Sequence, residues 1–155
     1  VSLLAKEGIF KKREDIREAF VKSAALETYF AWERYKTINA NAKSQLETGK
    51  IPDEFLRSMK YSFGDFRDIF FGTDITSHDH ILDVSENAKN KLNEKNDKKK
   101  SNNELLDDWW NEHGKEIWEG MLCALPHNEN FKEKSEYKPP PEEFAETPQF
   151  FTMVY

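Results

Sequence analysis

The sequence has a single cysteine, few glycines and prolines, and no long hydrophobic run. Its 155 residues include 6 Gly and 6 Pro. This scarcity, together with few valines, argues against a sheet protein with many tight turns and favours an all-α fold. No apolar run approaches the ~20 residues of a membrane-spanning helix. The opening residues do not resemble a secretory signal peptide either, so we expect no membrane segment and no signal peptide in this chain.

The lone cysteine, Cys123, leaves two interpretations open. One is a thiol of a protein in a reducing compartment, or a buried structural thiol. Alternatively, the chain is a fragment and the disulfide partner of Cys123 lies outside it. Composition does not decide between these two interpretations.

Acidic residues outnumber basic ones, 29 to 23, so the formal net charge is -6. A nucleic-acid-binding protein normally has a basic field, so the sequence predicts no nucleic-acid partner. The charge is unevenly distributed, however. Residues 89–100 hold six lysines, whereas residues 133–146 are mostly acidic.

Aromatic residues are abundant, at 14% of the chain. They are densest in residues 23–36, SAALETYFAWERYK, which hold Tyr29, Phe30, Trp32 and Tyr35 within seven positions. Aromatic side chains so dense on one helix are expected to be buried on more than one side. We therefore expect the other helices to pack around this stretch.

Hydrophobic spacing and helix-end signals predict four helices. Gly49 and Gly72 are natural stops, Pro126 ends the last of these helices, and Ser101-x-x-Glu104 has the form of a capping box. The four predicted helices are Asp15–Leu46, Asp53–Phe71, Ser77–Glu94 and Glu104–Leu125.

The predicted organisation is a single domain, in which residues 14–125 form a helical core. Residues 1–13 are a lead-in to the first helix, and residues 126–147 are a polar, Pro-punctuated loop. Thr147 and Pro148 have the pattern of an N-cap followed by Pro at the first helical position. Residues 148–155 are therefore predicted to be the start of a truncated helix.

The best candidate ligand contact in the sequence is a run of lysines: Lys95, Lys98, Lys99 and Lys100. Several lysines on one loop attract a polyanion such as a sulfated glycan through their charge. The alternative is a solvated loop without a ligand.

Two neighbouring tryptophans, Trp109 and Trp110, point to two faces of one helix. We expect one ring in the core and the other under the loop at 127–147.

No catalytic, cofactor-binding or metal site is predicted. Adjacent His78, Asp79 and His80 cannot all turn toward one ion, and His113 and Cys123 lack the spacing of a metal pair or of a nucleophile and its base. We interpret His113 as a helix-face histidine with hydrogen-bond partners.

Four motifs in order resemble those of a Duffy-binding-like domain, most closely in the erythrocyte membrane protein 1 variant adhesins of the malaria parasite. They cover roughly Phe20 to Phe151. The motifs are SAALETYFAWERYK, IPDEFLRSMKYSFGDFRDIFFGTDI, WWNEHGKEIWEGMLCAL and TPQF. The resemblance implies a partial domain, namely the helical core, or middle subdomain, of such a domain.

The resemblance also implies a function. Members of this family are variant surface antigens on infected erythrocytes, extracellular parts of membrane-anchored proteins, and they act in cytoadherence, virulence and immune evasion. The implied partners are a host cell-surface protein, a sulfated glycosaminoglycan such as chondroitin sulfate, or immunoglobulin M, together with neighbouring domains of the same parent. The implied protein is not an enzyme and has no cofactor. Cys123 would form a disulfide with a partner outside this chain. The alternative, based on composition alone, is an intracellular helical scaffold.

Overall fold

The computed structural model describes residues 13–72, 79–94, 100–126 and 131–141. Within these residues the regular structure is helical, with five α-helices and one 3₁₀ helix, so the predicted all-α fold class is confirmed. The elements are α2 (Arg13–Ile38), α3 (Ala42–Glu47), α4 (Asp53–Phe71), α5 (Asp79–Asn93), α6 (Asn102–Cys123) and η1 (Phe131–Glu133). The lead-in at 1–12 and the helix predicted at 148–155 lie outside the described residues.

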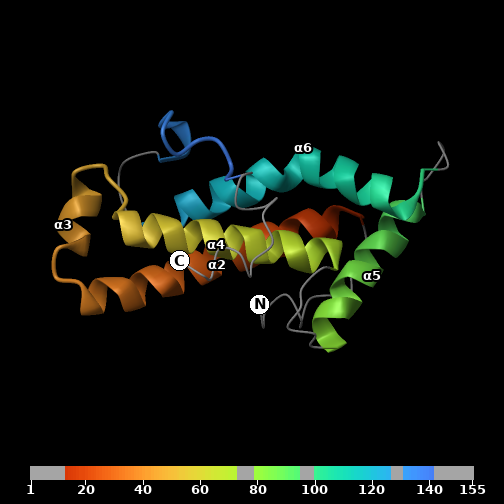
Figure 1. Ribbon diagram of the computed structural model, residues 1–155, viewed down its shortest axis with the longest axis horizontal. Coiled ribbons are helices and arrows are strands. Elements are labelled where there is room, and N and C mark those ends of the chain that lie inside the picture. Colours follow the sequence, from red (N-terminus) through yellow and green to blue (C-terminus); the bar gives the residue numbers. More distant parts are fainter. Residues whose placement is uncertain (1–12, 73–78, 95–99, 127–130, 142–155) are drawn as a thin grey trace.

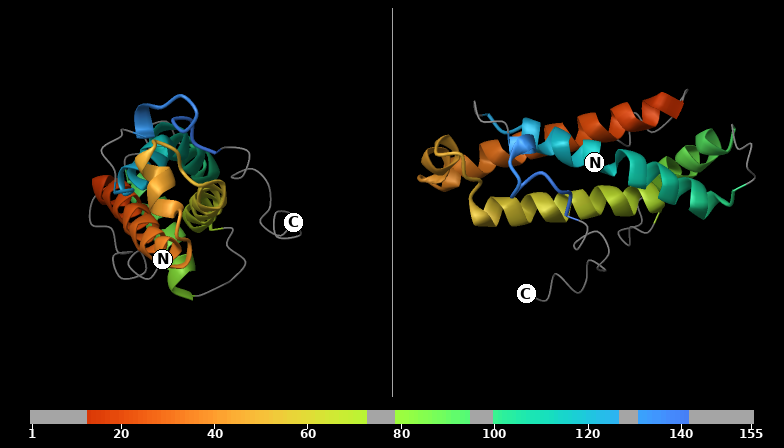
Figure 2. Two further views of the ribbon diagram at one scale, coloured as in Figure 1. Left: turned by 90° about the vertical axis from the view of Figure 1, so that its left-hand side faces the viewer. Right: turned by 90° about the horizontal axis from the view of Figure 1, so that it is seen from above.

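Three long helices, α2, α4 and α6, run along one another and form the body of the bundle (Figures 1 and 2). The most extensive contact among the described helices joins α2 to α6. Helix α5 crosses one end of the bundle, whereas the short α3 lies at the other end (Figure 1). The first and last long helices of the described chain are thus direct neighbours.

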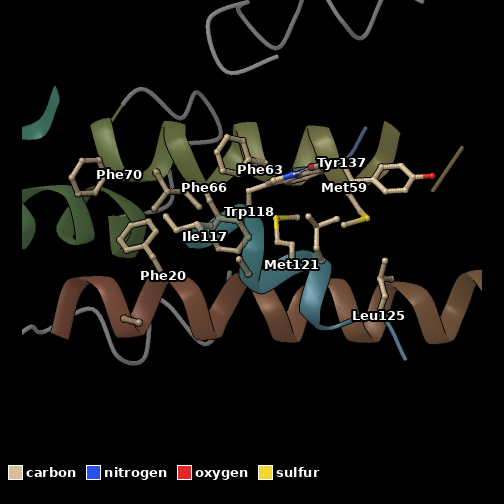
Figure 3. Packing of buried hydrophobic residues seen from close by; sticks show 14 of the residues in the cluster. Phe20, Met59, Phe63, Phe66, Phe70, Ile117, Trp118, Met121, Leu125 and Tyr137 are labelled. Carbon is tan, nitrogen blue, oxygen red and sulfur yellow. Dashed lines mark hydrogen bonds between the residues drawn. The ribbon is translucent and has the colours of Figure 1, made fainter. Parts of the chain in front are cut away.

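Aromatic rings from three helices meet in the centre of the core. Phe20 of α2 makes edge contacts with Phe66 and Phe70 of α4, at ring-centroid distances of 6.4 and 5.6 Å. Phe70 stacks on Trp109 of α6 at 4.5 Å. Figure 3 shows Phe20, Phe66 and Phe70 beside Ile117 and the other labelled core side chains. Offset and edge contacts of this kind add stability beyond area burial, so these rings fix how the three helices pack.

The predicted bounds of α4 are confirmed at both ends. Pro52 precedes the first helical residue, and Gly72 ends the helix with a left-handed φ of 75°. The Gly72 backbone amide donates to the carbonyls of Asp68 and Ile69, which would otherwise lack partners at the helix end. The capping box of α6 is confirmed as well, because the Ser101 side chain accepts a hydrogen bond from the Glu104 amide.

The prediction of one helix from Asp15 to Leu46 is wrong, because α2 ends at Ile38 and α3 begins at Ala42. The physical reason lies in two asparagines between them. The side-chain amide of Asn39 donates to the Tyr35 carbonyl at 3.0 Å, the same oxygen that its own backbone amide uses. Asn side chains compete for backbone partners in this way and favour helix ends, and Asn41 adds a second residue of this type.

Small residues let α2 and α6 approach closely. A Cβ added at Gly120 of α6 would lie 2.9 Å from Cγ1 of Val21, and the neighbouring Ser23 and Ala24 of α2 are buried. Gly120 therefore permits the close approach of α6 to α2 at Val21.

Residues 131–141 fold back onto the bundle over Trp118. The indole Nε1 of Trp118 donates to the backbone carbonyl of Tyr137 at 2.7 Å. The hydroxyl of Tyr137 accepts from the backbone amide of Ile51 at 3.0 Å, and Lys134 Nζ donates to the carbonyl of Gly49 at 2.8 Å. This segment is therefore anchored to α6 and to the start of α4.

The second ring of the tryptophan pair was expected to lie under the loop at 127–147, of which the structure describes residues 131–141. Trp109 is buried as expected, but Trp110 packs on α4, with its ring 5.4 Å from that of Phe63 and 6.0 Å from that of Phe71. The tryptophan beneath the loop is Trp118. It lies eight residues after Trp110, about two helical turns further along α6.

Candidate binding surfaces

The predicted lysine contact falls largely outside the described residues, since these include Lys100 but not Lys95, Lys98 or Lys99. Lys100 Nζ forms an ion pair with Asp108 Oδ2 of α6. The hydrogen bond and the negative charge of Asp108 raise the pKa of Lys100 above its ordinary value. A polyanion would therefore compete with Asp108 for Lys100, and the lysine run as a glycan contact stays a prediction.

Cys123 is the last residue of α6, where it is exposed and its thiol is free. His113 lies ten residues earlier on the same helix, which corresponds to a rise of about 15 Å. The structure therefore does not bring the two side chains together as a nucleophile and its base. An exposed thiol at a helix end is accessible to an external partner, as the predicted disulfide requires.

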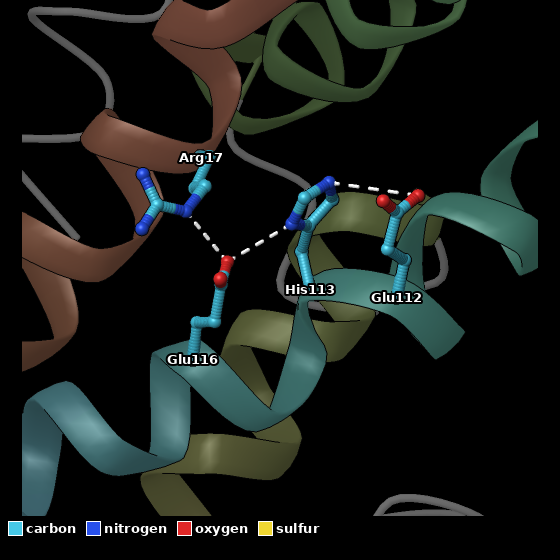
Figure 4. Close-up of polar contacts among 4 residues, drawn as sticks. All are labelled: Arg17, Glu112, His113 and Glu116. Carbon is cyan, nitrogen blue, oxygen red and sulfur yellow. Dashed lines mark hydrogen bonds and ion pairs between the residues drawn. The ribbon is translucent and has the colours of Figure 1, made fainter.

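A cluster of charged groups joins α2 to α6 around Glu116, as Figure 4 shows. Arg17 Nε of α2 donates to Glu116 Oε2 at 2.6 Å, and the same oxygen lies 2.9 Å from Nδ1 of His113. The second ring nitrogen of His113 lies 3.8 Å from Oε2 of Glu112. The interpretation of His113 as a helix-face histidine with partners is confirmed.

The arrangement assigns a tautomer to His113. A carboxylate oxygen only accepts, so Nδ1 must carry the proton that it shares with Glu116. The other ring nitrogen faces a second carboxylate, that of Glu112. Partial burial alone would raise the pKa of Glu116, but hydrogen bonds from His113 and Arg17 outweigh burial and hold the pKa of this carboxyl below its ordinary value.

Sequence reasoning missed this cluster because Arg17 and Glu116 are 99 residues apart. The i, i+3 spacing of His113 and Glu116 was a visible signal for the half of the cluster that lies on one helix. The cluster stabilises the α2–α6 contact rather than offering a site for chemistry.

An apolar surface lies on the second half of α2, contrary to expectation. Of the four aromatic residues in SAALETYFAWERYK, Trp32 is 1% exposed, whereas Tyr29 and Phe30 are 42% and 54% exposed. Leu26, one helical turn before Phe30, is 38% exposed. We call Leu26, Tyr29 and Phe30 the α2 apolar patch. The prediction that this stretch is buried on more than one side is therefore wrong for Tyr29 and Phe30, whereas the side that carries Trp32 is covered by the bundle.

The physical reason for the exposed patch is the position of the other helices. Trp32 and Tyr35 meet the Phe55 ring of α4 at 5.1 and 5.3 Å, so one side of α2 faces the bundle. Tyr29 and Phe30 contact each other at 5.4 Å on another side. Exposed apolar patches often belong to interaction sites, so the α2 apolar patch is a candidate binding surface.

A membrane-spanning helix and a metal site were both sought in the residues that the structure describes. None of the helices there is both long and apolar enough to span a membrane. Nor do three or more His, Cys, Asp or Glu side chains gather there as a metal site would require. This statement does not extend to His78, Asp79 and His80, because the structure does not describe their side chains.

Comparison with known proteins gives a family match. The sequence model of one protein family, described as the Duffy binding domain, matches residues 3–151. A similar protein is the "Duffy receptor gamma form" of Plasmodium knowlesi, with 30% identity over 89 residues, which is 55% of this chain. The matched part is 7% of that relative, so the chain spans only a small part of its length. No solved structure matches significantly.

Proposed function

Because this chain belongs to the Duffy binding domain family, we propose that it is an adhesion module that binds a receptor on a host cell. The observation that carries this proposal is the family match, which extends over residues 3–151. The Plasmodium knowlesi relative is named a Duffy receptor. A role in binding also suits a bundle whose described surface includes an exposed aromatic patch.

The finer proposal is a variant surface antigen of the malaria parasite, displayed on the infected erythrocyte by a membrane-anchored parent protein. Its support is the order of the four sequence motifs, which resemble those of the erythrocyte membrane protein 1 adhesins. The ligand would be an endothelial adhesion protein, chondroitin sulfate or immunoglobulin M. Cytoadherence, virulence and immune evasion would follow from such binding.

Two surfaces suit two kinds of ligand. The lysine run Lys95 to Lys100 suits a sulfated glycan, although Asp108 already pairs with Lys100. The α2 apolar patch suits a protein, because aromatic side chains are enriched at protein–protein interfaces and a patch without basic side chains at its centre offers nothing to a sulfate group.

A binding array tests the proposal. The full chain is applied to immobilised chondroitin sulfate, heparin, intercellular adhesion molecule and immunoglobulin M, at low salt and at 0.15 M salt, near the physiological ionic strength. We expect saturable binding to one ligand. Heat-unfolded chain is the control, because binding that depends on charge alone persists after unfolding, whereas binding to a folded site is lost. Equal binding of folded and unfolded chain, or binding to none of the ligands, contradicts an adhesion role for this part of the parent.

A further inference from the structure

Exposed side chains form a continuous row along the second half of α2. Leu26, Phe30, Arg34 and Ile38 are four residues apart, so they stand one above another on the same side of the helix. Phe30 is 54% exposed and Ile38 is 82% exposed, and Arg34 is exposed as well. The row rises by about 18 Å from Leu26 to Ile38. We call these four residues the α2 ridge, which extends the α2 apolar patch to the end of the helix.

The described helices leave this side of α2 uncovered. Figures 1 and 2 show the second half of α2 along an edge of the bundle, with α4 and α6 on its inner side. Trp32 and Tyr35 lie on that inner side, where both rings meet Phe55 of α4. The α2 ridge lies on another side of the same turns.

The apolar area of the ridge is large enough for the centre of a protein interface. The exposed parts of its apolar side chains and of the neighbouring tyrosine amount to roughly 400 Å², contributed by Leu26, Tyr29, Phe30 and Ile38. About 57% of a typical interface is apolar, so this area corresponds to an interface of roughly 700 Å² on this chain. Specific complexes bury about 800 Å² per partner. The ridge and its polar surroundings are therefore of the size that one protein partner needs.

The ridge carries positive charge at two points. Lys22 lies one turn before Leu26, and Arg34 lies one turn after Phe30, and both basic residues are exposed. Two positive charges therefore bracket the Leu26–Phe30 pair along the helix. A basic stripe stands out on this chain because its formal net charge is -6.

The acidic residues near the ridge leave this part of α2 with a net positive charge. Glu33 forms an ion pair with Lys36 at 3.0 Å, and Glu27 is half-buried. From Lys22 to Ile38 the helix has three basic residues and two acidic ones. A partner with acidic side chains is thus favoured over one with basic side chains.

The same charges oppose a second copy of this chain as the partner. Two antiparallel copies of the ridge, with Leu26 opposite Phe30, would place Lys22 opposite Arg34 of the other copy. Two parallel copies would place each basic residue opposite its own equivalent. Like charges that face each other across an interface are destabilising. The ridge is therefore complementary to a different surface.

We propose that the α2 ridge docks an acidic amphipathic helix of the protein that this module binds. Two aliphatic side chains of that helix, four residues apart, contact Leu26, Phe30 and Tyr29. An acidic residue one turn beyond each of them pairs with Lys22 and with Arg34. Rows of side chains four residues apart are the ridges with which helices interlock. This inference rests on the proposed adhesion function and names the partner class for it.

A helical peptide tests the proposal without any host receptor. The probe is a stapled helix with Glu, Leu, Leu and Glu at successive intervals of four residues, an order that reads the same in both directions. The control peptide has Lys in place of both Glu residues. Fluorescence anisotropy with the full chain measures both affinities at low salt. We expect the acidic peptide to bind at least about tenfold more tightly, and this preference to shrink as salt is raised.

Two variants locate the binding. Phe30→Ser should weaken binding of the acidic peptide about tenfold, because it removes a central aromatic contact. Arg34→Glu should reduce the preference for the acidic peptide, whereas Lys138→Glu makes the same charge change at an exposed position of the segment at 131–141 and should not. Both ridge positions are exposed, so these substitutions leave the core intact.

Three results would overturn the proposal: equal affinity for the two peptides, peptide binding that Phe30→Ser leaves unchanged, or no saturable binding of the acidic peptide. Sedimentation of the chain alone provides a further test. A dimer that Phe30→Ser dissociates would overturn the proposal as well, because a second copy would then occupy the ridge. The peptide assay can fail while the binding array succeeds, and the reverse, so failure of this inference is distinguishable from failure of the proposed function.

Discussion

Trp118 and Tyr137 are joined by a hydrogen bond of 2.7 Å from the indole Nε1 to a backbone carbonyl, and both residues are buried. This bond is the main polar link between α6 and the segment at 131–141. Tyr137 also serves as acceptor for Ile51 through its hydroxyl, so one residue ties the segment to two helices.

Trp118→Phe should lower the free energy of unfolding by about 1–3 kcal/mol, because the Tyr137 carbonyl would remain buried without its donor. Urea unfolding followed by circular dichroism measures the change. Tyr137→Phe is the matched test of the other bond, since it leaves the Ile51 amide without an acceptor. If both variants are as stable as the wild type, the segment does not hold its described position in solution.

Gly120→Ala should destabilise the protein although Ala is the better helix former. The new Cβ would lie 2.9 Å from Cγ1 of Val21, a β-branched side chain with little rotamer freedom. Overpacking of this kind costs about 1–3 kcal/mol, which exceeds the gain of about 1 kcal/mol in helix propensity.

Val21→Ala provides the control for Gly120→Ala. In the Val21→Ala background the added methyl group has room, and Gly120→Ala should then be neutral or stabilising. The change in unfolding free energy caused by Gly120→Ala is measured in the wild type and in the Val21→Ala variant, which gives a double-mutant cycle. A Gly120→Ala effect of the same size in both backgrounds would refute a close approach at this point.

Glu116→Gln should reduce stability at neutral pH and make no difference in strong acid. The pKa of Glu116 is held below its ordinary value in the folded protein, so its ionised form is favoured there. Stability from such a carboxyl is present above the unfolded-state pKa and is lost as the pH falls through the folded-state pKa.

The expected size of the Glu116→Gln effect at pH 7 is about 0.2–1 kcal/mol, since Arg17 is half exposed and solvent screens the pair. Unfolding between pH 7 and pH 2 measures it. Glu112→Gln is the control, because Glu112 is more exposed and lies 3.8 Å from His113; its effect should be smaller. A Glu116→Gln deficit that stays constant down to pH 2 would exclude the carboxylate charge as its cause.

Replacement of Lys98, Lys99 and Lys100 by Gln should weaken binding to a sulfated glycan and leave binding to a protein ligand unchanged. The loss should shrink as salt is raised, because the interaction is electrostatic. Replacement of the exposed Lys43, Lys50 and Lys138 by Gln removes the same charge elsewhere. Undiminished glycan binding by the first triple variant at low salt would show that the lysine run is not the contact.

Cys123 should react with a thiol reagent in the folded chain at the rate of an accessible cysteine, since it is exposed and free. In the longer parent protein the same thiol should be blocked by its disulfide partner. Thiol titration with and without denaturant, on both proteins, measures this. A freely reactive Cys123 in the native parent would favour the intracellular scaffold over the adhesin.

Local signals gave the fold class and most helix ends. The bounds of α4 follow from Pro52 and Gly72, and the start of α6 follows from the Ser101 capping box, because these residues act on backbone groups within one turn. The break after α2 was also signalled locally, by Asn39 and Asn41. Hydrophobic spacing outweighed that signal in the prediction and placed a single helix there.

Contacts between distant segments were beyond the reach of a single sequence. The pattern of α2 shows that it is rich in aromatic residues but not which of its sides the bundle covers, so Tyr29 and Phe30 were predicted to be buried. The pairing of Arg17 with Glu116, and of Trp118 with Tyr137, depends on which helices become neighbours. A residue pattern within one helix does not contain that information.

The side-by-side packing of the first and last long helices has a consequence for immune recognition. A surface that includes both Arg17 and Glu116 exists only when α2 and α6 are joined in the closed bundle. A linear peptide from either helix does not reproduce it. Antibodies against this surface would therefore distinguish folded chain from unfolded chain, and an immunogen that is meant to present it would need to include both helices.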